Sequence, residues 1–188
     1  TSTDLEGNPI PYASQPLAVM EDVVSASAGA DFTVALKADG TLWTWGGNDE
    51  GQLGTGTTEG SATPVQVLDQ VTAVVAGDYH VVALRTDGTL WTWGDNLYGQ
   101  LGDGTYTSRP TPAQVMEGFT TVAAGVGATA AICTDSTLWT WGDNLFGQLG
   151  DGTQDSRPTP QQILTDVSAV NLGGYHAAAL RTDGTLWM

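Results

Sequence analysis

Few side chains in this sequence could carry acid–base or metal chemistry, and they are scattered. The two histidines, His80 and His176, lie far apart, and neither stands in a spacing that brings a second ligand or a catalytic partner beside it. A metal site or a general base needs several groups that converge on one point. We therefore expect both histidines to be structural, each bonded to nearby backbone within its own unit of the fold. Cys133 is the single cysteine, which excludes an internal disulfide.

The acidic loops are a second candidate for chemistry. The stretches "DNLYGQLGDGT" at 95–105 and "DNLFGQLGDGT" at 143–153 carry oxygen ligands of the kind that Ca²⁺ prefers. Their spacing differs from that of an EF-hand, and the bidentate glutamate is missing. Asp, Asn and Gly are also the usual residues of tight turns. We therefore predict neither a metal nor a cofactor, and interpret as turn residues Asp95, Asp103, Asp143 and Asp151.

Composition and motifs exclude several functions. The chain has 21 acidic and 5 basic residues and a formal net charge of −16, which disfavours binding to nucleic acid or to anionic lipid. No apolar run approaches the roughly 20 residues of a membrane span, and the N-terminal stretch lacks the pattern of a signal peptide. The motifs "GxSxG", "HExxH" and the Gly-Lys-Ser/Thr phosphate loop are all missing. We expect no catalytic residues and no enzyme activity.

An internal repeat of 48 residues organises the chain. Equivalent positions are held by Trp43, Trp91, Trp139 and Trp187. A lead segment, 1–15, is followed by units at 16–63, 64–111, 112–159 and an incomplete 160–188. In the second unit the runs "PVQVL", "VTAVVAG", "HVVALR" and "TLWTWG" predict four β-strands, near Val71–Ala76, His80–Arg85 and Thr89–Trp93 for the last three, because they are short and rich in β-branched and aromatic residues.

The turns and the tryptophans complete this prediction. Asp87-Gly88 predicts a tight turn, and Asp135-Ser136, at the same place in the next unit, predicts a more strained one. Trp91 and Trp93 are two apart on one strand, so we expect both to face the same neighbour and to be buried. Repeated strands without helices predict an all-β protein made of β-propeller blades with four antiparallel strands each.

The stretch "GDYHVVALRTDGTLWTWGDNLYGQLGDGT" at 77–105 resembles the repeat of the regulator of chromosome condensation family. The shared motifs are Gly-x-x-His, Asp-Gly at the turn, Trp-Gly-x-Asn and Gly-Gln-Leu-Gly. The histidine is replaced by Phe32 in the first copy and by Ala128 in the third. The resemblance implies a seven-bladed ring, of which this chain would be a partial arc of about four blades. We expect either a fragment of a longer protein or copies that associate to close a ring.

Positions that differ between copies mark the expected binding face, because variable residues on a repeated scaffold often contact partners. They fall just before each "GQLG" and just before the second strand of each unit; an alternative is that the aromatic residues pack on their own blade. The candidate binding residues are Asp78, Tyr79, Leu97, Tyr98, Leu145, Phe146 and Tyr175.

These observations predict a non-enzymatic protein-binding or scaffold module. We expect it to belong to a larger secreted or cell-surface protein, to bind a protein partner, and to form homo-oligomers. Two alternatives come from the family that the chain resembles: exchange of guanine nucleotide on a small GTPase, as in the founding member, or inhibition of a secreted enzyme. The scarcity of basic residues separates this chain from the chromatin binding of that founding member.

Overall fold

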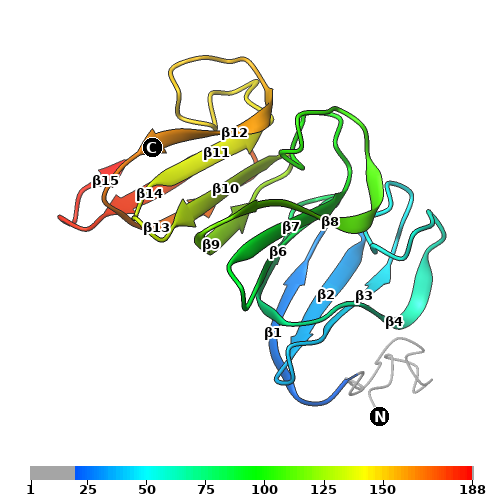
Figure 1. Ribbon diagram of the computed structural model, residues 1–188. Coiled ribbons are helices and arrows are strands. Elements are labelled where there is room, and N and C mark those ends of the chain that lie inside the picture. The colour runs from blue at the N-terminus through cyan, green and yellow to red at the C-terminus, as the bar shows by residue number, and fades with distance from the viewer. Residues whose placement is uncertain (1–19, 188) are drawn as a thin grey trace, which may run out of the picture.

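The computed structural model describes residues 20–187, which form four antiparallel β-sheets stacked side by side in an arc (Figure 1). The first sheet has the order β1 (Val23–Ala28), β2 (Phe32–Lys37), β3 (Leu42–Gly46) and β4 (Ser61–Leu68). The second has the order β5 (Val71–Ala76), β6 (His80–Arg85), β7 (Thr89–Gly94) and β8 (Arg109–Glu117). The lead segment 1–15 lies outside the described residues.

The other two sheets repeat this plan. The third contains β9 (Phe119–Ala124), β10 (Ala128–Cys133), β11 (Leu138–Gly142) and β12 (Arg157–Leu164). The fourth contains β13 (Val167–Leu172), β14 (Ala177–Arg181) and β15 (Leu186–Trp187). The expected all-β architecture of about four blades is confirmed, and residues 20–187 hold no helix of the length and apolarity that crossing a membrane requires.

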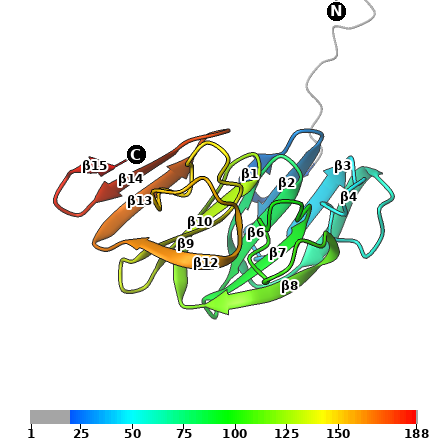
Figure 2. The same ribbon diagram turned by 90° about the horizontal axis from the view of Figure 1, so that it is seen from above.

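The blades are offset from the sequence units. The run "PVQVL", Pro64–Leu68, was grouped with the strands that follow it, but it lies in β4 and pairs with β3, where Thr44 faces Val65. The long loop after β3 returns the chain beside that strand, whereas the short link after Leu68 carries it across to the next sheet. The second, third and fourth sequence units therefore each contribute their first strand to the preceding blade, as β4, β8 and β12 (Figure 2).

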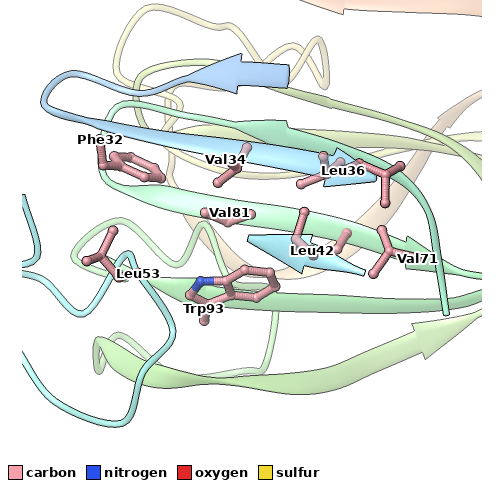
Figure 3. Close-up of a cluster of buried hydrophobic side chains, with 10 residues drawn as sticks. Phe32, Val34, Leu36, Leu42, Leu53, Val71, Val81 and Trp93 are labelled. Atoms are coloured by element: carbon pink, nitrogen blue, oxygen red, sulfur yellow. The ribbon is translucent and has the colours of Figure 1, made fainter. Parts of the chain in front are cut away.

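The second strands of the two inner blades, β6 and β10, are buried on both faces because a sheet packs on either side of each. In β6 the first five residues are buried, and β10 has the same pattern. The cluster between the first two sheets combines Phe32, Val34, Leu36, Leu42 and Leu53 with Val71, Val81 and Trp93 (Figure 3). Alternating side chains of β6 thus serve the first and the third blade.

The two tryptophans of the second and third blades differ in burial, and Trp43 and Trp45 of the first blade are both half-buried, which corrects the expectation that both members of a pair are buried. Trp93 and Trp141 are fully buried, but Trp91 and its equivalent Trp139 are half-buried. The Trp91 ring does pack against the same cluster as Trp93. Its outer side faces the Arg85 guanidinium, whose carbon lies 5.0 Å from the ring centroid, so a cation–π contact covers the part that the neighbouring blade does not.

The turn at Asp135-Ser136 is strained, as expected. Ser136 has φ of 66°, in the left-handed region where Gly88 has 78° in the preceding blade. Asp135 Oδ1 accepts hydrogen bonds from the Thr137 backbone N (3.0 Å) and Oγ1 (2.6 Å). Asp87 makes the same bonds to Thr89, so both blades have the same type of turn. Ser136 therefore adopts the left-handed backbone conformation, which is unfavourable for any residue with a Cβ atom.

Neighbouring blades are joined by an indole that reaches into the "GQLG" turn of the blade before it. Trp93 Nε1 donates to the Gln52 carbonyl at 2.9 Å, and Trp141 Nε1 donates to the Gln100 carbonyl at 2.9 Å. The glycine that ends the motif makes room for the ring. A Cβ at Gly54 or Gly102 would lie 2.7 Å from the indole nitrogen, closer than real Cβ atoms come.

Replacement of Gly102 by alanine should therefore destabilise the protein by about 2–4 kcal/mol, since a left-handed backbone conformation and an overpacked indole both cost free energy. Gly150→Ala is the matched control. Gly150 has φ of 72° against 73° for Gly102, but a Cβ there meets only Ile163 Cγ2 at 3.7 Å. This control should cost about 1–2 kcal/mol in urea unfolding. An equal loss of unfolding free energy in Gly102→Ala and Gly150→Ala would show that the Trp141 contact does not require glycine at position 102.

Candidate functional site

The residues that vary between copies gather at one end of the arc because of the strand order. In each four-stranded blade the first-to-second and third-to-fourth strand connections leave the same end of an antiparallel sheet, while the turns between the second and third strands lie at the other end. Blades stacked in the same orientation then place all these connections on a common face. We call this the loop face; it comprises residues 29–31, 47–60, 77–79, 95–108, 125–127, 143–156 and 173–176.

A groove on the loop face crosses from the first blade to the third. It encloses a cavity of about 440 Å³. Two tyrosines and several carboxylates contribute to its walls. The lining residues are Asp31, Asp49, Glu50, Tyr79, Asp95, Leu97, Tyr98, Val126 and Gly127.

The structure brings three of the seven candidate residues into this groove: Tyr79, Leu97 and Tyr98. Phe146 and Tyr175 form a second aromatic group at the next blade junction, with ring centroids 5.0 Å apart and planes tilted by 58°. Leu145, the sixth candidate residue, is 54% exposed in the third loop but does not line the groove.

Asp78 is placed elsewhere. It lines a separate cavity with the glycines that precede the second strands, and its carbonyl accepts a hydrogen bond from Ala30 N at 3.0 Å. Six groove residues lie outside the seven candidates. Five of them, Asp31, Asp49, Glu50, Val126 and Gly127, stand at variable positions that the repeat does mark as part of the expected binding face, and the sixth, Asp95, was interpreted as a turn residue.

The variable residues meet in pairs across blade junctions. The residue before "GQLG" in one blade lies beside the residue before the second strand of the next. Tyr98 packs over Gly127, where an added Cβ would lie 3.2 Å from the ring, and Phe146 stacks on Tyr175. At the first junction Glu50 and Tyr79 line the same groove. Each junction thus presents a different pair of side chains on a constant frame.

Buried amides hold that frame. In the second loop Asn96 Oδ1 accepts from Leu101 N at 3.0 Å, and Asn96 Nδ2 donates to the Thr105 carbonyl at 3.0 Å. Gln100 Oε1 accepts from Tyr98 N at 2.9 Å, and its Nε2 donates to Asp95 Oδ2 at 2.7 Å. The third loop repeats these bonds through Asn144 and Gln148, with similar distances. Tyr98 is therefore positioned by its own backbone.

The loop aspartates have the turn role expected of them. Asp103 Oδ1 accepts from Thr105 N at 2.9 Å, and Asp103 Oδ2 accepts from Arg109 Nη1 at 3.0 Å. Burial raises the pKa of Asp103, but the Thr105 hydrogen bonds and the Arg109 charge outweigh it and leave this pKa below its ordinary value. Within residues 20–187 no three His, Cys, Asp or Glu side chains are grouped to hold a metal ion. The absence of calcium binding stays a prediction.

His80 is structural, but its partner corrects the expectation of a bond within its own blade. His80 Nε2 lies 3.0 Å from Thr129 Oγ1 in the third blade, and Thr129 Oγ1 donates to the Gln100 carbonyl at 2.8 Å. The hydroxyl proton is thus used, so Nε2 donates. The imidazole is neutral because the ring is buried and Nδ1 has no hydrogen-bond partner among residues 20–187. The ring fits because position 77 is glycine, where a Cβ would lie 2.2 Å from the ring. His176 is exposed.

The groove carboxylates have no basic partner in the described part of the chain. All five lysine and arginine residues lie between positions 37 and 181, inside the described part of the chain. The ion pairs found there join Arg85 to Asp69, Arg109 to Asp103 and Arg157 to Asp151. None of these pairs includes a residue that lines the groove. The groove is therefore a negative surface with aromatic walls.

Four-stranded sheets packed face to face in an arc define a partial β-propeller. The chain belongs to the RCC1-like domain family, whose model matches residues 1–188. Over 39 residues it is 54% identical to the regulator of chromosome condensation of Xenopus laevis, which covers 21% of this chain and 9% of that protein. The family that the repeat motifs indicated is confirmed.

Solved structures support the same fold. Human WBSCR16 superposes with a TM-score of 0.77 at 24% identity, over 87% of this chain and 46% of that one. Prp20p of Saccharomyces cerevisiae, whose binding to Gsp1p and histones has been characterised, superposes with a TM-score of 0.76 at 23% identity, over 84% and 43%. This chain spans less than half the length of these proteins, and the likeness shows the fold.

His80 should make stability fall with acidity. Burial lowers its pKa to about 4 from 6.5, with the charge of nearby Asp95 opposing that shift. Between those values the unfolded chain binds a proton that the folded chain does not, so stability is complete above pH 6.5 and decreases as the pH falls towards 4, by about 3 kcal/mol.

His80→Phe should remove that loss, because phenylalanine already occupies the equivalent position 32 and Thr129 keeps its bond to Gln100. Urea unfolding of wild type and His80→Phe between pH 7 and 4.5 measures how the free energy of unfolding of each depends on pH. Protonation of carboxylates affects both proteins equally, so it cancels when the two are subtracted. His176→Phe, at an exposed site, is the control and should follow the wild type. An identical pH slope in wild type and His80→Phe would contradict the neutral buried imidazole.

Proposed function

We propose that this chain is a non-enzymatic protein-binding module and that the loop face makes the contact. The observation that carries the proposal is the gathering of large apolar side chains on this face beside the groove. Leu97 is 66% exposed, Phe146 67% and Tyr175 55%. Exposed apolar residues that cluster around a hollow, with a polar rim, are typical of protein–protein contact sites.

The groove chemistry supports binding over catalysis. Its lining has carboxylates and phenols but no histidine, cysteine, serine or lysine, so the described groove offers no nucleophile paired with a base. The partners of Prp20p, Gsp1p and histones, are proteins, which supports a protein as the partner class here. The extracellular or cell-surface location and the two alternatives, nucleotide exchange and enzyme inhibition, stay predictions.

A loop-face variant should lose the partner. Leu97→Ser combined with Phe146→Ser removes two exposed apolar side chains, and the melting temperature should stay close to that of the wild type because neither is in the core. Val24→Ser with Leu186→Ser is the matched control, since these residues are 64% and 66% exposed on β1 and β15, away from the loop face. Because they lie on the end sheets, all proteins are compared at a concentration where light scattering gives them the same mass. In affinity capture from the source organism, a partner should bind wild type and control and be lost with the loop-face variant.

If the loop-face variant captured the same proteins as the wild type and the control, the loop face would not be the binding surface. A nucleotide-release assay with a panel of small GTPases tests the exchange alternative in parallel, with magnesium chelation as the positive control. Acceleration of release by the wild-type chain would establish exchange in place of simple binding.

We also propose that the isolated 188-residue chain self-associates through the exposed sheets at the two ends of the arc. Val23 and Val24 on β1 are 39% and 64% exposed, and Leu186 and Trp187 on β15 are 66% and 46% exposed. Val19, also expected on this surface, lies outside the described residues. Light scattering across a concentration series should show mass above the monomer, increasing with salt because screening reduces repulsion between highly negative chains. A constant monomer mass would refute it.

A further inference from the structure

The groove on the loop face holds charge that nothing in the described chain neutralises. Asp31, Asp49 and Glu50 are exposed along its first-blade side. Asp31 Oδ1 accepts one hydrogen bond, from Gln52 Nε2 at 3.2 Å, while no hydrogen bond or ion pair of the Asp49 and Glu50 carboxylates is found in the described chain. A ligand that enters beside them meets three carboxylates with free acceptor positions. A cationic ligand is stabilised there more than a neutral or anionic one.

The opposite side of the groove is aromatic. Tyr79 is 40% exposed and Tyr98 is half-buried, and both line the cavity together with Leu97. A cation within about 6 Å of a tyrosine ring is attracted by its face, most strongly when it is an arginine guanidinium or an alkylated ammonium. Tyr98 is held against Gly127 by its own loop, so this wall is preformed.

The spacing of the carboxylates selects the kind of cation. No three acidic or histidine side chains of residues 20–187 converge closely enough to ligate a metal ion. The cavity of about 440 Å³ is also far larger than one ion needs and falls in the usual size range of organic ligand sites. Dispersed carboxylates facing aromatic rings suit a side chain that carries its charge on an apolar stem, as arginine and lysine do.

Resting on the proposed protein-binding function, we propose that this groove binds a basic segment of the partner by receiving an arginine or lysine side chain between the carboxylates of Asp49 and Glu50 and the ring of Tyr79. Glu50 belongs to the first blade and Tyr79 to the second, and both line the groove, so the site needs two adjacent blades. The net charge of −16 would attract such a segment from a distance, and the groove would then select it by contact.

The test uses a fluorescently labelled hexa-arginine peptide and a hexa-citrulline peptide, which has the same shape without the charge. Fluorescence anisotropy at 150 mM salt should show that the intact chain binds the arginine peptide at least tenfold more tightly than the citrulline peptide. Asp49→Asn with Glu50→Gln should weaken the arginine peptide at least fivefold. Tyr79→Leu should weaken it at least threefold, because it keeps an apolar side chain and removes the aromatic face.

Glu21→Gln with Glu117→Gln is the matched control. It also removes two negative charges, but from exposed positions away from the groove: Glu21 lies just before β1 and Glu117 lies at the end of β8. It should change affinity less than twofold. An equal loss in both double variants would mean that the peptide senses only the overall field, and equal binding of citrulline would exclude a cationic ligand; either result overturns the inference. Melting temperatures close to the wild type verify that every variant is folded.

The outcomes separate this inference from the proposed function. A partner that depends on Leu97 and Phe146, together with indifference to the groove charges, overturns the cationic site alone. Specific binding of the arginine peptide, without any partner that depends on the loop face, overturns the protein-binding proposal while the groove still recognises a cation.

Discussion

The contact between an indole and the "GQLG" turn of the preceding blade is the interaction on which the rest of the arc depends. Trp93 fills the space that the missing side chain of Gly54 leaves, and its Nε1 donates to the Gln52 carbonyl at 2.9 Å. The hydrogen bond fixes direction, and the close packing fixes distance, so one sheet can sit on the next in only one way. Trp141 and Gln100 repeat the contact one blade later.

This contact also positions the loop face. Gln100 accepts the Trp141 indole and the Thr129 hydroxyl at its carbonyl, while its side-chain amide bonds Tyr98 N and Asp95. The same residue therefore joins two blades and holds the loop that carries Tyr98. A groove that crosses blade junctions is rigid only where such joints are rigid, because its walls come from different sheets.

Constancy and variation are divided in space. The joints consist of the glycines, the buried amides and the second tryptophans Trp93 and Trp141. They are the same at the first two junctions, so they cannot give one of these junctions a function that the other lacks. The exposed residues beside them differ: Glu50 with Tyr79 is acidic, and Phe146 with Tyr175 is aromatic. Three of the arginines are paired with aspartates outside the groove, so these arginines do not neutralise the carboxylates at the junction of Glu50 and Tyr79. Recognition can thus change without a change of fold.

The sequence by itself determined the all-β architecture, the period of 48 residues and the family, because the turn and strand signals lie within short stretches and are repeated in register. It also marked the variable positions. Only the tertiary structure decided which strand completes which blade, since pairing of β4 with β3 depends on where a long loop returns the chain. The partner of His80 and the burial of Trp93 but not Trp91 likewise depend on the adjacent sheet.

The groove could be predicted only in part for the same reason. Tyr79, Leu97 and Tyr98 were recognisable as variable residues, but they share the groove with Asp49 and Glu50 only because the first two blades stack, with 29 to 49 residues of chain between these positions. Asp78 varies as Tyr79 does, yet the turn before β6 directs it to another cavity. Local signals specify what each blade presents; the stacking of one blade on the next decides which of those side chains share a surface.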